Sequence, residues 1–383
     1  MQTFKFQNEK CNDDRLEEWI ETAVARGVQH LSVQIEEIED IEEVDPPYVT
    51  QEIYRSNTLV SLYLIGVGIE TPDCVVSLPR FKAMHIEDVQ HDDDPLIVEN
   101  IISGCPVLEV LAIIRTTESE SLSAVKSLRV RSQTLRSFKI LFENWFGGMH
   151  YAVEIDAPSL EYMSFRDDNS GVIVVKNLTS LYAIHIDTEF NLGFANYDGN
   201  PLGPKDSSKI KTIHDFLEGI SGVRHMFISP STIEILSQYS EFGSIPKFAN
   251  LYRLNAEFSS STIQLLPIFL ESCPNLKELL LDYGGSKPIE LSYVHRCLIS
   301  TLEFVYINQH FPMDKTGIKL VNYFLENSAV LKELKLNFCG RTFTNKEQEI
   351  CKNLLTPTKL SRRCQVSIKE PVIIQEHCRA LKY

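Results

Sequence analysis

A short apolar pattern, Leu-x-x-Leu-x-Leu, recurs along nearly the whole chain. Its clearest copies end two longer motifs, Phe269–Leu281 and Phe324–Leu336, and a looser copy ends at Ile113 in the stretch Ile101–Ile113. Each copy consists of an apolar helix end, a turn and then the hexad, in which apolar and polar positions alternate as in a strand. Self-similarity of this kind predicts a protein built from stacked repeats.

The spacing of the hexads supports that prediction. Twelve hexads begin at Val28, Leu59, Phe81, Leu108, Leu135, Leu160, Leu181, Val223, Leu251, Leu276, Leu302 and Leu331. From Leu59 on, the intervals are 22, 27, 27, 25, 21, 42, 28, 25, 26 and 29 residues. Nearly all lie in or near the window of roughly 20 to 29 residues typical of leucine-rich repeats. The interval of 42 contains 191–208, rich in Gly, Asn and Pro, which we interpret as a loop insertion.

The hexads predict an α/β leucine-rich-repeat solenoid, a horseshoe with a parallel sheet on its concave face and helices on its convex face. A single repeat cannot bury its three apolar residues, whereas stacked neighbours can. Helices should end before Cys105-Pro106 and Cys273-Pro274, because proline cannot continue them. The strict repeat has Asn or Cys eight residues after its first leucine. Only Cys339 fits among the positions compared, so we expect irregular repeats.

The region before the first hexad reads as a helix. Asp14 can cap its N-terminus, and Glu17, three residues on, can complete the capping box. Trp19 and Ile20 begin an apolar stripe at helical spacing. Gly27 then ends the helix, because glycine tolerates a left-handed conformation.

Composition narrows the class of protein and its location. The 383 residues are 43% hydrophobic and 23% charged, with a net charge of -15, which disfavours binding to nucleic acid or to anionic membranes. Acidic residues concentrate in the loops 36–45 and 92–94, interpreted as solvated loops. The longest apolar run, 59–69, is far short of the ~20 residues of a membrane helix, and the N-terminus lacks a signal-peptide core. Nine cysteines without a Cys-x-x-Cys pair predict buried thiols in an intracellular protein, cytoplasmic or nuclear.

No catalytic motif was found, so the chain is predicted not to be an enzyme and to need no cofactor. It has no phosphate-binding Gly-x-x-x-x-Gly-Lys-Ser/Thr loop, no Gly-x-Ser-x-Gly elbow and no His-Glu-x-x-His zinc motif. His85, Asp88, His91 and 92–94 could be drawn as a metal cluster. We interpret them as a solvated loop instead, because no second group of ligands faces them by spacing.

The residues between the hexad leucines are the candidate binding surface, because the predicted strands turn them toward the concave face. Four of the ten histidines fall on these positions. Aromatic side chains and Arg are typical of protein recognition surfaces. The candidate partner-binding residues are His30, Tyr63, His85, Tyr162, His185, His225, Phe227, Arg253, Phe304 and Tyr306. Two alternatives stay open: these side chains pack on one another, or the His-rich face belongs to a small-molecule receptor or enzyme.

Several stretches resemble a known family, the plant F-box/FBD/LRR-repeat proteins. They are 19–31, 77–86, 103–109 and 157–160, and the part from about Cys297 through 302–305 to 362–364 is similar to the FBD domain. The resemblance implies a repeat region that holds a protein substrate for a cullin-RING ubiquitin ligase. In that family an N-terminal F-box docks on the Skp adaptor.

The resemblance gives a domain division and a prediction about partners. We expect a leucine-rich-repeat region at 1–295, an FBD-like domain that continues the solenoid at 296–371, and a tail at 372–383. No F-box-like helical stretch precedes Phe4, so this chain should not bind the Skp adaptor or cullin by itself. The expected partner is a protein substrate or peptide of unknown identity.

Overall fold

The fold was analysed in a computed structural model of the chain. The structure describes residues 2–8, 15–35, 46–91, 96–116, 127–143, 151–168, 170–192, 202–284, 289–309, 315–338 and 359–369. The chain divides into two compact units, and each is considered by itself. The N-terminal unit comprises residues 1–184 and 188–220, and the C-terminal unit comprises residues 185–187 and 221–383.

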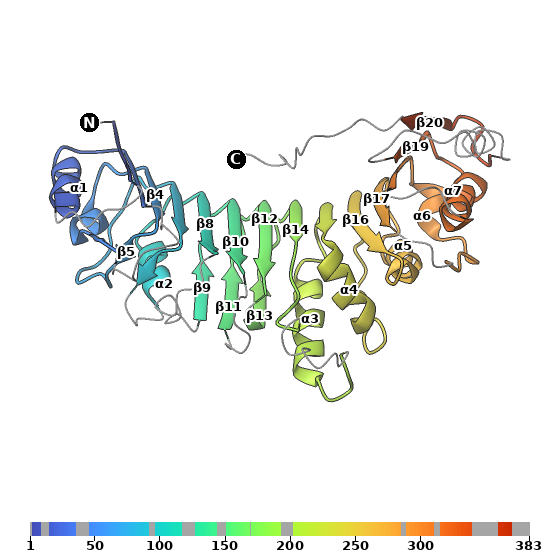
Figure 1. Ribbon diagram of the computed structural model, residues 1–383, viewed down its shortest axis with the longest axis horizontal. Helices are drawn as coiled ribbons and strands as arrows, with labels where there is room; N and C mark the ends of the chain where they lie inside the picture. Colours follow the sequence, from blue (N-terminus) through green and yellow to red (C-terminus); the bar gives the residue numbers. More distant parts are fainter. Residues whose placement is uncertain are drawn as a thin grey trace. The chain divides into compact units, whose positions relative to one another are not determined.

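The main sheet of the N-terminal unit is parallel, and its strands lie side by side in the order of the chain (Figure 1). Its strands are β1 (Thr3–Asn8), β2 (His30–Ile35), β4 (Ser61–Ile65), β6 (Ala83–Glu87), β8 (Val110–Arg115), β10 (Ser137–Phe142), β12 (Tyr162–Asp167) and the start of β14 (Ala183–Ile186). Their register aligns the hexads, so that Leu62 lies beside Leu31 on one neighbour and Met84 on the other. Repeats therefore stack residue for residue.

The segments that return from one main strand to the next differ along the N-terminal unit. The helical ones are α1 (Arg15–Ala25), the 3-10 helix η1 (Gln51–Arg55), α2 (Ile97–Ser103) and α3 (Ser207–Gly219). The extended ones are β3 (Tyr48–Val49), β5 (Gly68–Ile69), β7 (Gln90–His91), β9 (Ser127–Arg131), β11 (Tyr151–Asp156) and β13 (Ser170–Lys176). They form two further parallel sheets, β3-β5-β7 and β13-β11-β9. Strands therefore occupy several places in this unit where helices were expected. A segment such as β9 alternates buried Leu128 and Val130 with exposed arginines, which is the pattern of a strand.

The C-terminal unit follows the predicted strand-helix alternation. Its parallel strands, again in chain order, are the end of β14, β15 (His225–Ile228), β16 (Arg253–Ser259), β17 (Glu278–Gly284), β18 (Phe304–Gln309), β19 (Glu333–Phe338) and β20 (Gln365–Lys369). Its helices are α4 (Pro230–Tyr239), the 3-10 helix η3 (Ile263–Leu265), α5 (Leu266–Ser272), α6 (Arg296–Ser300) and α7 (Lys315–Asn327). The leucine-rich-repeat solenoid with a large, open parallel sheet is thus confirmed.

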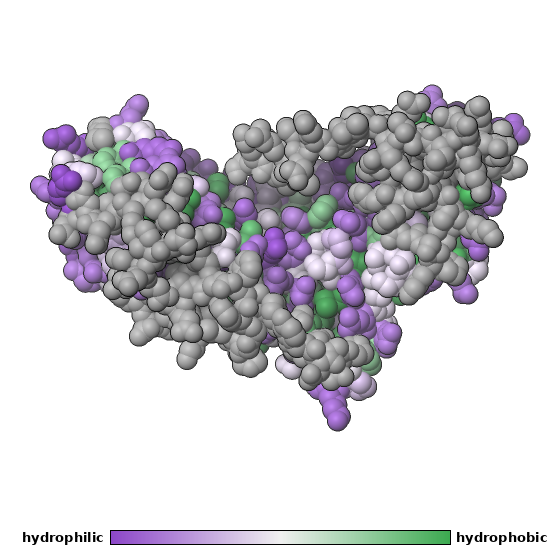
Figure 2. All heavy atoms as spheres, in the orientation of Figure 1, coloured by the Kyte–Doolittle hydropathy of each residue, from purple (hydrophilic) through white to green (hydrophobic). Residues whose placement is uncertain are grey.

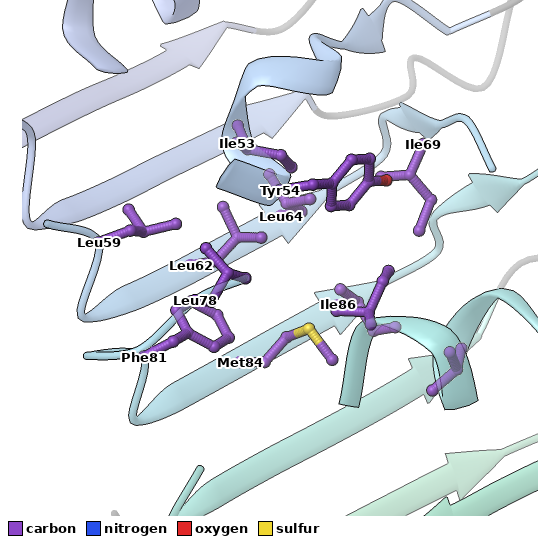
Figure 3. A pocket seen from close by; sticks show the side chains of 12 residues that line it. Ile53, Tyr54, Leu59, Leu62, Leu64, Ile69, Leu78, Phe81, Met84 and Ile86 are labelled. Atoms are coloured by element: carbon purple, nitrogen blue, oxygen red, sulfur yellow. The ribbon is translucent and has the colours of Figure 1, made fainter. Parts of the chain in front are cut away.

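The hexad side chains form the core of both units. All three apolar residues of each of the twelve predicted hexads are buried, and the most accessible of them, Leu62, is only 7% exposed. Figure 3 shows how this works in the N-terminal unit. Leu62 and Leu64 of β4 and Met84 and Ile86 of β6 point toward the same interior as Tyr54 of η1. The space left between these side chains is only about 10 Å³.

Local signals placed the helix ends correctly. Helix α1 ends at Ala25, and Gly27 has φ +70°. The amide of Gly27 donates to Val24 and that of Val28 donates to Ala23, which closes the helix as the sequence predicted. The predicted cap, Asp14, lies outside the described residues. Helices α2 and α5 stop before the two Cys-Pro pairs.

Side-chain hydroxyl groups link consecutive repeats at the start of several hexads. The residue just before a hexad, or within two positions of it, often carries a hydroxyl that reaches back to a carbonyl of the preceding repeat. The bonds are Thr58 Oγ1 to Val28 O (2.9 Å), Thr134 Oγ1 to Leu108 O (2.8 Å), Thr301 Oγ1 to Leu276 O (2.8 Å) and Ser361 Oγ to Leu331 O (2.6 Å). Each satisfies a carbonyl at the start of a buried hexad.

Candidate interaction face

The predicted binding residues lie on one side of the main strands. Strand β4, for example, alternates half-buried Ser61, Tyr63 and Ile65 with buried Leu62 and Leu64. We call the half-buried or exposed side chains between the hexad leucines the open face. Its candidate residues are His30, Tyr63, His85 and Tyr162 in the N-terminal unit, and His185, His225, Phe227, Arg253, Phe304 and Tyr306 in the C-terminal unit.

In the N-terminal unit, the side chains of Tyr63 and His85 stack on each other. They are register partners on β4 and β6, and their rings stack with centroids 4.1 Å apart. His85 Nε2 lies 2.8 Å from Glu87 Oε2. Partial burial, with the negative charge of Glu87 adding to it, raises the pKa of Tyr63, so the phenol stays neutral. The imidazole of His85 therefore has two partners within the open face itself, the Tyr63 ring and the Glu87 carboxylate.

The other two N-terminal candidates lie apart from this trio. His30 Nδ1 is 2.8 Å from Ser61 Oγ on the neighbouring strand. Tyr162 is 51% exposed on β12 and packs edge-on against Tyr182, with ring centroids 6.2 Å apart. Strands β8 and β10 separate β12 from β6. The candidate residues of the N-terminal unit therefore lie on the open face, but they do not form one continuous cluster.

A row of charges at the start of the N-terminal strands is also internally compensated. These residues directly follow the first apolar residue of each hexad. Lys82 Nζ lies 2.8 Å from Glu109 Oε1, and Arg136 lies 3.7 Å from Glu161. The hydrogen bond from Lys82 lowers the pKa of Glu109 below its ordinary value. Opposite charges thus alternate from one repeat to the next.

The C-terminal unit brings several candidates into contact. His185 and Phe227 meet edge to face, with ring centroids 4.3 Å apart. His225 stacks on Tyr252, with centroids 5.9 Å apart. Partial burial lowers the pKa of His225, and the positive charge of Arg253 lowers it further, so this imidazole is neutral near pH 7.

Further along the same face, aromatic rings alternate with charged groups. Arg253 Nε lies 3.8 Å from Glu278 Oε1, between β16 and β17. Tyr306 donates a hydrogen bond to Glu333 Oε2 at 3.3 Å. The ammonium of Lys335 lies 5.7 Å from the centroid of the Tyr306 ring. Burial, followed by the charge of Glu333, raises the pKa of Tyr306.

Several residues that border this face at the strand starts were not among the predicted binding residues. Tyr252 is 39% exposed, and Lys277 Nζ lies 5.4 Å from the centroid of its ring. Lys332 Nζ approaches the Phe304 ring at 5.9 Å and bonds to Glu303 at 2.8 Å. The four new residues, Tyr252, Lys277, Glu303 and Lys332, each directly follow the first residue of a hexad. That fixed offset could have identified them. Figure 2 shows hydrophilic residues interspersed with smaller apolar areas on the surface in view.

The residues considered for metal binding have other partners. His85 contacts Glu87, and the carboxylate of Asp88 accepts hydrogen bonds from the backbone and hydroxyl of Thr116 at 2.6 and 2.7 Å. Residues 92–94 and the loop 36–45 lie outside the described residues. Within the part of the chain that the structure describes, no group of three potential ligands is placed to hold a metal ion.

Two hollows in the structure bear on whether the His-rich face could bind a small molecule. The apolar cavity of about 10 Å³ in the N-terminal core has room for about one water molecule. A larger open hollow of about 480 Å³ in the C-terminal unit is lined by Lys247, Glu271, Pro274, Tyr293, His295 and Arg296. It is formed by helix ends and loops. The predicted His-rich face does not line either hollow.

The described thiols and helices fit the sequence-based interpretation in part. Cys105, Cys273, Cys297 and Cys364 are buried free thiols, and Cys74 is partly exposed. Burial raises the pKa of Cys105 and of Cys297 to about 12, which keeps both protonated. Among the described helices, none combines the length and apolar character needed to span a bilayer.

Comparison with known proteins assigns the family. A family model described as "FBD-associated F-box protein At5g56370, LRR repeats" matches residues 16–180, and the FBD model matches residues 289–336. A putative F-box/FBD/LRR-repeat protein of Arabidopsis thaliana, At5g44950, is 53% identical over 362 residues, covering 93% of this chain and 79% of the relative. The chain belongs to the F-box/FBD/LRR-repeat family.

Further relatives agree with this assignment. The F-box/FBD/LRR-repeat protein At2g26030 of Arabidopsis thaliana is 50% identical over 368 residues, covering 95% of this chain and 82% of the relative. The F-box/FBD/LRR-repeat protein At1g13780 of the same plant is 41% identical over 384 residues, covering 96% and 81%. The resemblance to a plant family is thereby confirmed. The family names point to interaction proteins rather than enzymes.

Proposed function

We propose that this F-box/FBD/LRR-repeat chain binds a protein partner through the open face of its C-terminal unit. The partner would be a substrate for ubiquitylation, held as in the substrate-recognition part of a cullin-RING ligase. The observation that supports this most is the row of half-exposed rings His225, Tyr252, Phe227 and Phe304 among charged side chains. Such a mixture of aromatic and charged groups is typical of binding hot spots.

The open face of the C-terminal unit is favoured over that of the N-terminal unit because more of its groups are available to a partner. In the N-terminal unit His85 is held by both the Tyr63 ring and the Glu87 carboxylate. In the C-terminal unit the side-chain charges of Arg224 and Lys277 form no ion pair with described residues, and Arg253, although 3.8 Å from Glu278, keeps 43% of its side chain exposed. An arginine beside aromatic rings can bind a carboxylate or a carbonyl of the partner.

The test is quantitative affinity purification with a matched control. Tagged wild-type chain is compared with the triple variant H185A/H225A/R253A and with a control variant, E18A/K205A/E241A, whose three positions are exposed and lie off the open face. We expect specific partners to be lost from the first variant and kept by the second, with both variants folded by circular dichroism. Full recovery of partners by H185A/H225A/R253A would move the binding site elsewhere.

The proposal extends to the ligase machinery. Residues 1–383 by themselves are expected to bind partner protein without binding the Skp adaptor or cullin. A pull-down with purified chain, adaptor and cullin tests this directly. Stoichiometric recovery of the adaptor would contradict it. Native mass spectrometry of the same protein addresses the small-molecule alternative, which a stoichiometric bound ligand would favour.

A further inference from the structure

Positive charge gathers at one edge of the C-terminal open face, where the strands begin. Arg224 and Lys277 flank Tyr252 in the row that precedes β15, β16 and β17. The side chain of Arg224 is exposed, and its guanidinium makes no hydrogen bond or ion pair with the described residues. It is close enough to His225 to help lower the pKa of that imidazole. The next cation along the row, Lys332, is already bound to Glu303. Unpaired positive charge therefore lies around Tyr252.

Negative charge gathers at the opposite edge, where the same strands end. Asp187, Glu257 and Asp282 occupy equivalent positions, six residues after the first residue of their hexads. Glu257 and Asp282 are register partners on β16 and β17. Within the described structure Asp282 is half-buried and its carboxylate has no ion-pair or hydrogen-bond partner, whereas Asp187 accepts from Ser231 at 3.1 Å. The two edges of the face thus have opposite charge.

The area between the edges is nearly neutral in charge. Arg253 and Glu278 pair with each other, and the next register pair is Asn255 with Leu280. From Lys277 to Asp282 the chain advances five residues along a strand, or about 17 Å at 3.3 to 3.4 Å per residue. A segment in extended conformation needs about six residues to cross that distance.

We infer that the open face of the C-terminal unit binds an extended protein segment with an acidic side chain at one end and a basic side chain about five residues away. The acidic group lies over Arg224 and Lys277, and the basic group lies over Asp282. Apolar or aromatic side chains between them contact Tyr252, Phe227 and Leu280. The inference rests on the proposed function, because it describes the partner of that same face.

Charge complementarity of this kind sets orientation and specificity more than total affinity. Reversing one charge replaces an attraction with a repulsion. We therefore expect a loss of about three- to tenfold in affinity for a matching peptide, since tenfold corresponds to about 1.4 kcal/mol. The N-terminal unit gives no such prediction, because its strand-start charges are paired as Lys82 with Glu109 and Arg136 with Glu161.

The experiment selects binders from a displayed library of random peptides against the full wild-type chain. The expected binders contain an acidic and a basic residue four to six positions apart. Synthetic peptides made from them are then titrated against K277E and D282K. K205E and E18K are the matched controls, because they make the same changes of charge at exposed positions off the face. In these titrations K277E should weaken peptides that carry the acidic residue, and D282K should weaken those that carry the basic one. Replacing that residue of the peptide with alanine should abolish the difference.

The possible outcomes separate this inference from the proposed function. Binders that lose affinity in H185A/H225A/R253A but show no spaced acid-base pattern would overturn the inference and leave the proposed function intact. Patterned binders that respond equally to K277E and K205E would also overturn it. A library without any binder to the wild-type chain would count against both.

Discussion

The two units use the same hexads but complete them differently. In the C-terminal unit, helices α4 to α7 connect successive strands, whereas the N-terminal unit fills part of that layer with the strands β9, β11 and β13. The open faces differ as well. N-terminal charges at the strand starts pair with each other, while Arg224 and Lys277 in the C-terminal unit make no ion pair with described residues. The comparison indicates that the hexads determine the stacking, and that the residues between them determine whether a face is self-contained or available to a partner.

The largest effects should come from the hexads, and they should be equal in the two units. Leu279 of β17 is 0% exposed and Leu111 of β8 is 1% exposed. Replacing either with alanine removes buried apolar volume and should cost about 2–5 kcal/mol of unfolding free energy. Hydrogen exchange with mass spectrometry checks where the loss falls. We expect L279A to speed exchange in β16–β18, and L111A in β6–β10. Unchanged exchange in those strands would contradict the stacking account.

A substitution at one turn of the N-terminal unit should lower the stability more than the same substitution at a turn of the C-terminal unit. Gly66 has φ +61°, and a Cβ there would lie 2.2 Å from the carbonyl oxygen of Ile35. G66A should therefore cost about 1–3 kcal/mol through backbone strain and this clash. Gly222 of the C-terminal unit is the matched control, because a Cβ at that position meets nothing within 4 Å. Thermal unfolding of the two variants compares them, and a G66A variant as stable as G222A would disprove the strain.

Smaller, matched effects are expected from the hydroxyl bonds between repeats. Thr58 in the N-terminal unit and Thr301 in the C-terminal unit make the same bond to the preceding repeat, at 2.9 and 2.8 Å. Thr→Val keeps the shape and removes the donor, so each variant should lose about 0.5–1.5 kcal/mol of unfolding free energy. Chemical denaturation measures both. If only one variant lost stability, the two bonds would not have the same role.

Removing the ion pairs on the sheet β13-β11-β9 of the N-terminal unit should have the smallest effect on stability, and this effect should depend on pH. Glu154 of β11 contacts Lys176 at 3.0 Å and Arg131 at 3.3 Å. The hydrogen bond from Lys176 is the main reason that the pKa of Glu154 is lowered from 4.5. A lowered pKa in the folded state adds stability above the unfolded value and loses it as pH falls through the folded value.

The variant E154Q keeps the shape of the side chain and removes its charge. Its melting temperature should lie below that of the wild type at a pH of about 7, and the difference should shrink as the pH falls below 4.5. K176M is the companion variant, since it removes the main partner. A difference that stays constant from neutral to acid pH would show that the ion pairs have no part in it.

The sequence predicted the core better than its ends. The apolar residues of every predicted hexad are buried. The prediction succeeded because three apolar residues at a fixed spacing are enough to identify a repeat. Strands β1 and β20 were missed. By register, Phe4 lies beside Leu31 and Val366 beside Leu334, which places Arg363 at the first position of a hexad. Arg363 is not apolar, so the hexad of β20 does not match the pattern. The sequence Met-x-x-Phe4-x-Phe6 at β1 does match it and could have been recognised.

The candidate face could be predicted only as a set of positions. Alternation along each strand identified residues such as His85 and His225, since burial of the leucines turns their neighbours outward. Which side chains then meet depends on cross-strand geometry. The stack of Tyr63 on His85 and the contact of His225 with Tyr252 follow from register and rotamer. A sequence without aligned strands does not specify either.

Site-specific photocrosslinking in cells tests the central claim most directly. A photoreactive phenylalanine derivative is placed at Phe227 or Phe304 in the C-terminal unit, and at Tyr63 in the N-terminal unit as the comparison. The account predicts crosslinks to the same partner protein from positions 227 and 304, and none from position 63. Crosslinks from Tyr63 alone, or partner binding without a crosslink at 227 or 304, would contradict it.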